Sequence, residues 1–135
     1  MNSLAGKRIC VIDDKADNIF ILLMLLKQLG ASGVVVWWSQ DQVRKIVREL
    51  PLDAILLDLM LPGARSGYAV IQELRSVPGL ENIPIVAVSA ADAATALPKA
   101  RELGFDGFIS KPIDSDAFPE QLQSILNGDP VWAVR

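Results

Sequence analysis

The chain has 135 residues, a net charge of −3 at pH 7 and no histidine. That length suits one domain with a substantial core. Without histidine, the chain cannot supply a Ser-His-Asp triad, histidine-ligated zinc or a phosphohistidine of its own. The acidic balance and the lack of Lys/Arg clusters argue against direct binding of nucleic acid.

Three features indicate a soluble protein of a reducing compartment. No apolar stretch reaches the roughly 18 residues that a membrane span requires. The N-terminus lacks the charged head and long apolar centre of a secretory signal. The single cysteine, Cys10, cannot form an internal disulfide and is expected to pack in the core. We therefore expect a cytoplasmic protein that does not insert into membranes.

In the first part of the chain, strand-like and helix-like segments alternate. An apolar strand is predicted over residues 8–13, followed by a helix over 16–29 that ends at a glycine. Residues 33–37 predict a second strand. A capping box opens a second helix at Ser39, and Pro51 enforces its end because proline disfavours helical geometry in the residue before it.

The middle of the chain repeats the pattern. An apolar strand over residues 54–57 ends in Asp58, and a helix is expected from Ser66 or Gly67 to about Ser76. Another apolar strand covers residues 85–89.

The last part predicts one more strand between two helices. A helix is expected from Thr95 to Gly104, which puts Pro98 in the first turn, where its missing N–H costs little. A strand runs from 108 to 111. The final helix ends before residue 127 and has Pro119 in its opening turn; its expected caps are Ser115 or Asp116.

This alternation predicts an α/β fold with a doubly wound, five-stranded parallel sheet and helices on both faces. The strands are almost continuously apolar, which is typical of strands buried on both sides. We expect residues 1–128 to form the domain and residues 129–135 a short tail that is too small for an output domain.

Polar side chains stand at the ends of four predicted strands. They are Asp13, Asp14, Asp58, Ser89 and Lys111. Because the carboxyl ends of parallel strands share one edge of the sheet, these side chains are expected to converge in the crevice where such sheets bind ligands.

These five side chains are of the types needed to bind Mg²⁺ and accept a phosphoryl group. Asp13, Asp14 and Asp58 supply oxygen ligands for Mg²⁺, which needs only a few protein carboxylates. Asp58 stands alone at its strand end and is the candidate nucleophile, since a carboxylate can form an acyl phosphate. Lys111 would offset phosphoryl charge, and the Ser89 hydroxyl would donate a hydrogen bond to a phosphoryl oxygen.

Each residue taken singly has an ordinary interpretation. An acidic pair after a strand is often only a helix cap, Ser89 a turn residue, and Lys111 a solvated charge. Taken singly, those interpretations are favoured. Together they leave unexplained why all four signals fall at strand ends, so the combined site is preferred.

At these residues the sequence resembles the receiver domain of two-component response regulators, in its stand-alone form. The matching motifs are the acidic pair in 12–14, the phosphoacceptor and following proline in 57–62, and the lysine and proline in 110–112. Ser89 matches the switch hydroxyl, and Phe108 stands at the position of the switch aromatic.

The resemblance implies a flavodoxin-like fold with strand order 2-1-3-4-5 and a phosphorylation-activated switch rather than an enzyme that turns over substrate. It implies transfer to Asp58 from a histidine kinase or histidine phosphotransfer domain. Mg²⁺, for which Mn²⁺ can substitute, would be held by Asp13, Asp14, Asp58 and the backbone carbonyl of Met60. A downstream protein target would bind the face formed by the fourth helix, fifth strand and fifth helix.

One spacing departs from the family. A glycine commonly follows the phosphoacceptor by eight residues, whereas Gly67 follows Asp58 by nine. We therefore expect the loop after the third strand to be longer by one residue, with an altered backbone near Met60.

The helix predicted over 16–29 is apolar in every direction along residues 19–26, so part of that apolar surface must be exposed. The docking surface predicted for a helical phosphodonor comprises Ile19, Phe20 and Leu23, next to the acidic crevice. The alternative is that the last helix or the tail covers it. The stripe expected to be buried comprises Ile21, Leu22, Leu25 and Leu29.

Three other functions are conceivable for a chain of this fold class. A Mg²⁺-dependent aspartyl-phosphate phosphohydrolase typically has a second aspartate two residues after the nucleophile, where this chain has Met60. A nucleotide or flavin carrier would need a Gly-x-Gly-x-x-Gly motif after the first strand, and none is present. A third alternative is a receiver-like module that is never phosphorylated.

Met60 and Ala91 carry no group to orient water, which predicts slow loss of the phosphoryl group.

Overall fold

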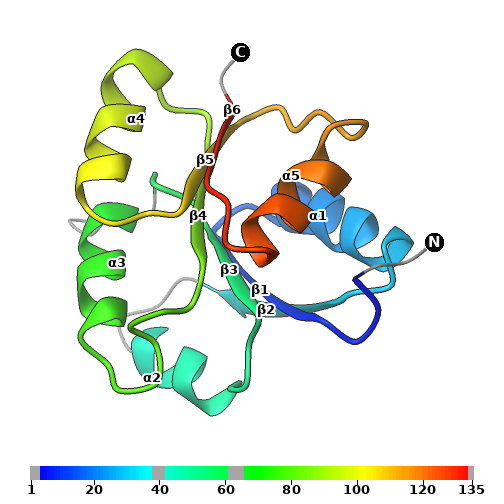
Figure 1. Ribbon diagram of the computed structural model, residues 1–135, viewed down its shortest axis with the longest axis horizontal. Coiled ribbons are helices and arrows are strands. Elements are labelled where there is room, and N and C mark those ends of the chain that lie inside the picture. The colour runs from blue at the N-terminus through cyan, green and yellow to red at the C-terminus, as the bar shows by residue number, and fades with distance from the viewer. Residues whose placement is uncertain (1–3, 38–41, 61–65, 134–135) are drawn as a thin grey trace.

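The computed structural model describes residues 4–37, 42–60 and 66–133. One parallel sheet forms the middle layer, with α1 and α5 on one face and α2, α3 and α4 on the other (Figure 1). In chain order the elements are β1 (Arg8–Asp13), α1 (Ala16–Gln28), β2 (Ser32–Trp37), α2 (Gln42–Arg48), β3 (Ala54–Leu57), α3 (Gly67–Arg75), β4 (Ile85–Ser89), α4 (Ala93–Glu102), β5 (Gly107–Ser110), α5 (Phe118–Leu126) and β6 (Val131–Ala133).

The sheet order is β2-β1-β3-β4-β5-β6, with every neighbouring pair parallel. The α/β class, the doubly wound sheet and the order of the first five strands are therefore confirmed. β1 lies between β2 and β3, so the connections leave it in opposite directions, and the crevice for a ligand opens at the carboxyl ends of β1 and β3.

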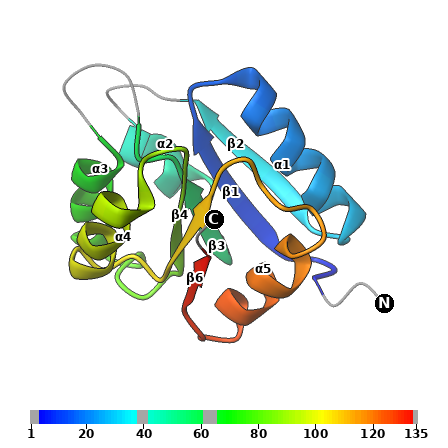
Figure 2. The same cartoon turned by 90° about the horizontal axis from the view of Figure 1, so that it is seen from above.

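The prediction of five strands is wrong, because residues 131–133 add a sixth strand beside β5. Figure 2 shows this last segment beside β5. A run of three residues is too short to show strand periodicity in sequence. Its strand geometry comes from pairing with β5.

Two apolar cores fill the space between the sheet and its helices. The larger core lies under α2, α3 and α4 and includes Leu57 and Phe108, both fully buried. The second lies under α1 and α5, with Leu22 and Phe118 at its centre. β3 and β4 are buried along their whole length, as the continuous apolar runs predict.

The buried stripe of α1 differs from the predicted one. Leu22 and Leu25 are buried as expected, but Ile19 is buried as well, and Ile21 is 48% exposed. Leu29 is only partly buried. The helix is rotated relative to the expected stripe; because nearly all candidate positions are apolar, the sequence could not select the rotation.

Helix α4 begins two residues before the expected start. Asp92 caps it by accepting a hydrogen bond from the backbone N–H of Ala94 at 3.2 Å, so Pro98 lies inside the helix instead of in its first turn. The Asp114 carboxylate accepts from the amides of residues 116 and 117 ahead of α5, in place of the caps predicted at Ser115 or Asp116.

Two expectations fall outside the described residues: the Ser39 cap of α2, and the longer loop within residues 61–65. Within the described part of the chain, no helix has the length and apolarity needed to cross a membrane.

Candidate functional site

The three predicted carboxylates meet at the edge of the sheet. Asp13 is the last residue of β1, Asp14 follows it, and Asp58 follows β3 directly. Each offers an oxygen that lies within 4.8 Å of the other two. Asp13 and Asp58 are buried, and Asp14 is partly buried. The parallel pairing of β1 with β3 brings these strand ends together.

Lys111 joins this cluster from the end of β5. Its Nζ lies 2.9 Å from Asp13 Oδ2 and 3.3 Å from Asp58 Oδ2. The Lys111–Pro112 peptide bond is cis. The Lys111 ammonium therefore forms ion pairs with two buried carboxylates, those of Asp13 and Asp58.

Backbone donors orient the remaining oxygens. Asp13 Oδ1 accepts hydrogen bonds from the N–H groups of Asp14 and Lys15, at 2.8 and 3.0 Å. Asp58 Oδ1 accepts from the Met60 N–H at 3.0 Å. Asp58 is thus held at one oxygen by the backbone and at the other by Lys111, which fixes the orientation of its carboxylate.

The surroundings raise the pKa of Asp58 above its ordinary value. Burial is the main cause, and the negative charge of Asp13 adds to it. The Met60 N–H and the Lys111 ammonium act in the opposite direction and offset part of the increase. Further positive charge at this site would stabilise the carboxylate form.

The donor set fits a divalent cation. Asp14 Oδ1 is buried and has no hydrogen-bond partner among residues 4–37, 42–60 and 66–133, although a buried carboxylate oxygen normally has one. It belongs to a three-carboxylate cluster to which, within the described residues, the Lys111 ammonium donates hydrogen bonds. Hard oxygen ligands of this kind are those that Mg²⁺ prefers. The free oxygen and the surplus negative charge both fit such an ion.

Ser89 lies at the end of β4 and is fully buried. Its Oγ accepts a hydrogen bond from the Ala91 N–H at 3.1 Å. The structure thus places the predicted hydroxyl at the same edge of the sheet as the carboxylates, while its hydrogen bond is to its own turn.

Phe108 is fully buried in the core under α4. The resemblance implies that this ring turns inward when Ser89 is drawn to a phosphoryl group. Here it lies inward while the Ser89 hydroxyl is bonded to Ala91.

Gly67 opens α3 against the end of β3. A Cβ at this position would lie 2.5 Å from the backbone oxygen of Asp58 and 2.8 Å from Leu59 Cα. Because both are backbone atoms, no side chain fits here. The glycine thus lets α3 approach the candidate nucleophile closely, although its spacing departs from the family's.

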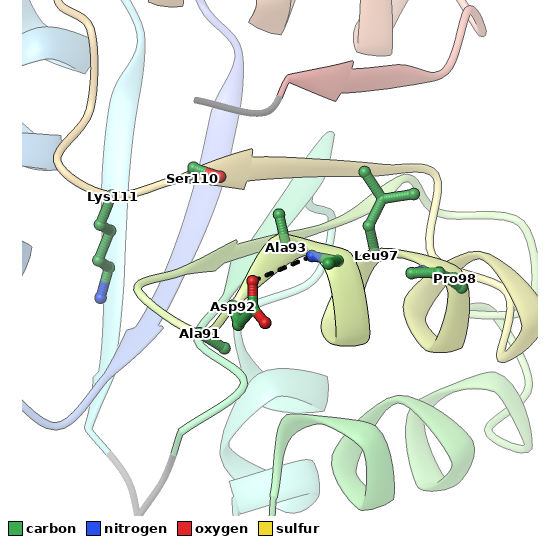
Figure 3. Close-up of a pocket in the computed structure, with 8 residues that line it drawn as sticks. Ala91, Asp92, Ala93, Leu97, Pro98, Ser110 and Lys111 are labelled. Atoms are coloured by element: carbon green, nitrogen blue, oxygen red, sulfur yellow. Dashed lines mark hydrogen bonds between the residues drawn. The ribbon is translucent and has the colours of Figure 1, made fainter.

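Two hollows flank Lys111. The first, of about 340 Å³, is the crevice over Asp58, and its other walls include Met60 and Pro112. The second, of about 530 Å³, lies on the α4 side, where the Leu97 side chain extends from the helix toward β5 (Figure 3). Ala91 lines this second hollow and Met60 the first, so only Met60 of the two positions expected to affect phosphoryl loss borders the crevice.

The three residues of the predicted docking surface on α1 differ in exposure. Ile19 is buried, which corrects its assignment, whereas Phe20 is 63% exposed and Leu23 is partly buried. A groove of about 720 Å³ contains Phe20 and Leu23. Among the described residues, neither α5 nor β6 covers Phe20, whereas Ile19 is buried in the core that α1 shares with α5. Residues that line the groove and that the sequence reasoning missed are Met24, Lys27 and Gln28.

Comparison with protein families matches residues 9–123 to the response regulator receiver domain. The match spans β1 to most of α5 and includes all the predicted site residues.

Solved structures of receiver domains and response regulators have a similar fold. A CheY-like response regulator receiver domain from Methylobacillus flagellatus is 30% identical, with a TM-score of 0.76 over 88% of this chain and 98% of that one. The receiver domain of the sensor histidine kinase PA1611 from Pseudomonas aeruginosa, with a magnesium ion in its active site cleft, is 24% identical, with a TM-score of 0.79 over 91% and 99%. A two-component response regulator from Clostridium difficile is 20% identical, with a TM-score of 0.78 over 90% and 97%.

Proposed function

Because the chain belongs to the response regulator receiver family, we propose that it is a Mg²⁺-dependent signalling switch that accepts a phosphoryl group on Asp58. The observation that carries this proposal is the position of Asp58: its carboxylate is buried, oriented by the Met60 N–H and paired with Lys111. A carboxylate fixed in this way at the floor of an open crevice is suited to attack phosphorus.

In the proposed transfer, an Asp58 oxygen forms a bond to phosphorus as the bond between phosphorus and the donor's histidine nitrogen breaks, and that nitrogen keeps the electron pair. Lys111 then balances charge on the phosphoryl oxygens. Asp13, Asp14, Asp58 and the Met60 carbonyl would hold Mg²⁺, with Mn²⁺ as a substitute. The bound ion supplies electrostatic stabilisation of the transferring group.

The phosphodonor is proposed to be a histidine kinase or a histidine phosphotransfer domain. Phe20 and Leu23 in the α1 groove would receive its helices, since exposed apolar surface of this kind commonly marks a partner site. Ile19 is excluded from that role because its side chain is buried.

The output is proposed to be altered binding of a protein target at the face formed by α4, β5 and α5. Ser89 and Phe108 would link this face to the phosphoryl group, because a hydroxyl that moves toward phosphate leaves space beside the ring. The switch would act through the domain predicted over residues 1–128, to which residues 131–133 add a strand. It would act in the cytoplasm and without contacting nucleic acid.

Met60 separates this proposal from a phosphohydrolase. It is 59% exposed and lines the crevice two residues after Asp58, but it has no acid or base to activate water. The buried, unpartnered oxygen of Asp14 favours the switch over a receiver-like module that is never phosphorylated, because such an oxygen fits a metal ligand.

The proposal is tested with acetyl phosphate and Mg²⁺, followed by intact-mass measurement. We expect the unmodified chain to gain one phosphoryl group and Asp58→Asn to gain none. Asp116→Asn is the matched control, since this exposed aspartate lies away from the carboxylate cluster. Equal labelling of Asp58→Asn would refute Asp58 as the acceptor, and a chain that is never labelled would favour the unphosphorylated module.

A further inference from the structure

The added strand β6 changes the face proposed for target binding. It lies against the outer edge of β5, alongside α5 (Figures 1 and 2). β5 is therefore an interior strand, and the three residues of β6, all half-buried, form this edge of the sheet.

Local structure directs β6 to this position. Gly128, at φ +91°, ends α5, and the Asp129 N–H bonds back to the Ser124 carbonyl at 2.9 Å. At the start of the pair, a Cβ on Gly107 would lie 2.7 Å from the Val131 carbonyl oxygen. The close approach of the two backbones thus depends on glycine in β5.

Trp132 is the anchor of β6. It pairs in register with Phe108, so both side chains lie on the same face of the sheet, and it packs against the core that contains Phe108. The Arg101 guanidinium of α4 lies 4.6 Å from the centre of the Trp132 ring, in a cation–π contact. β6 is thereby tied to α4 as well as to β5.

This arrangement explains why Phe108 is fully buried without a phosphoryl group. In register, Phe108 lies between Ala87 of β4 and Trp132 of β6. If β5 were the edge strand, the flank occupied by Trp132 would be open and the ring could swing toward solvent. Trp132 occupies that flank and packs against the core that contains Phe108.

We propose that β6 is a latch that holds Phe108 in its buried position, so that attachment of β6 and phosphorylation of Asp58 favour each other. The inference rests on the proposed function. Both events favour the same buried ring: β6 blocks its exit, and movement of the Ser89 hydroxyl toward a phosphoryl group would leave more space beside the ring in the position that it already occupies. Because coupling between two sites is reciprocal, each event strengthens the other by the same factor.

The first test uses the unmodified chain and beryllofluoride with Mg²⁺, a mimic of the phosphoryl group. Amide hydrogen exchange at residues 131–133 is measured with Mg²⁺ alone and with both ligands. We expect beryllofluoride to slow exchange of these amides by about fivefold or more. Unchanged or faster exchange while beryllofluoride is bound overturns the latch.

The second test measures beryllofluoride affinity in variants by calorimetry at constant Mg²⁺. Trp132→Ala opens the exit for Phe108, and Gly107→Ala pushes β6 away while keeping Trp132. Each is expected to weaken binding about fivefold. Trp37→Ala is the control, since it removes an exposed tryptophan from the opposite edge of the sheet.

The outcomes separate the two hypotheses. If the unmodified chain binds beryllofluoride and both variants bind it equally well, the latch is wrong and the phosphorylation switch stands. If the unmodified chain does not bind beryllofluoride in Mg²⁺, the proposed function fails, and the latch fails with it. Weakening confined to the two β6 variants supports the latch.

Discussion

Lys111 Nζ lies 3.3 Å from Asp58 Oδ2, although 53 residues separate them in the chain. The same ammonium is 2.9 Å from Asp13 Oδ2. In a site only partly open to water, this one cation is the main compensation for two buried negative charges. Changes to this triad are therefore expected to affect stability, metal binding and phosphoryl transfer in different directions.

Replacing Lys111 by methionine should separate metal binding from transfer. Loss of the ammonium leaves Asp13 and Asp58 without their cation, so the Mg²⁺-free protein is expected to lose about 3 kcal/mol of stability. Mg²⁺ should bind more tightly because a competing positive charge is gone, while phosphorylation by acetyl phosphate slows at least about tenfold. Denaturant unfolding, calorimetry and labelling rates measure the three effects. Lys15→Met, an exposed lysine beside the site, is the control, and a fall in Mg²⁺ affinity of Lys111→Met would contradict the account.

Asp58→Asn should stabilise the Mg²⁺-free protein at pH 7. Because burial raises the pKa of Asp58, the folded state binds more protons than the unfolded state once the pH exceeds about 3.8. Stability from this group therefore falls as the pH rises from there, and the cost is complete once the pH exceeds the raised pKa of the folded state. We expect a melting temperature a few degrees higher than that of the unmodified protein at pH 7, and a smaller difference at pH 4. Equal melting temperatures at pH 7 would show that Lys111 already offsets the burial.

Mg²⁺ should stabilise the folded protein through the carboxylate cluster. An ion that binds only the folded state adds about 2.7 kcal/mol at a concentration of 100 times its Kd. We expect a Mg²⁺-dependent rise in melting temperature for the unmodified chain and little or none for Asp14→Asn, which replaces the unpartnered oxygen. Asp92→Asn, at the cap of α4, should keep the full Mg²⁺ response. An undiminished response in Asp14→Asn would place the ion elsewhere.

Met60→Gln should shorten the lifetime of the phosphorylated state. The side chain of Met60 lines the crevice over Asp58, so an amide there can orient water toward phosphorus. Decay is expected to accelerate about tenfold, measured by following intact mass after removal of the donor. Met60→Leu keeps the apolar character and should decay as the unmodified protein does. If Met60→Gln and Met60→Leu decay equally, orientation of water at this position does not limit the rate.

Phe20→Asp should impair transfer from a protein donor and spare acetyl phosphate. Phe20 is the most exposed apolar side chain in the α1 groove, and a charge there opposes apolar docking. We expect transfer from a histidine phosphotransfer domain to slow about tenfold. Ile21→Asp is the control, because Ile21 is 48% exposed on the same helix but lies outside the groove. Equal slowing with both phosphodonors, or in both variants, would argue against docking at the groove.

Much of the acidic site could be predicted because its geometry follows from strand topology. Once β1, β3, β4 and β5 are parallel neighbours, the residues at their carboxyl ends must share one edge, as Asp13, Asp58 and Lys111 do. The surface of α1 could not be predicted in the same way. Ile19 and Ile21 are chemically alike, and only packing against the sheet decides that the first is buried and the second exposed.

The sequence by itself determined the α/β class and the meeting of the carboxylates with Lys111, because the alternation of strands and helices and the polar residues at the strand ends carry that information. The order of the first five strands was implied by the resemblance to the receiver family, and the sheet confirms it. Only the tertiary structure decided the rotation of α1, the early start of α4 and the pairing of β6 with β5. The reason is physical. β6 has just three residues, so it becomes a strand only by pairing with the edge of β5. That pairing also places Trp132 beside the buried Phe108.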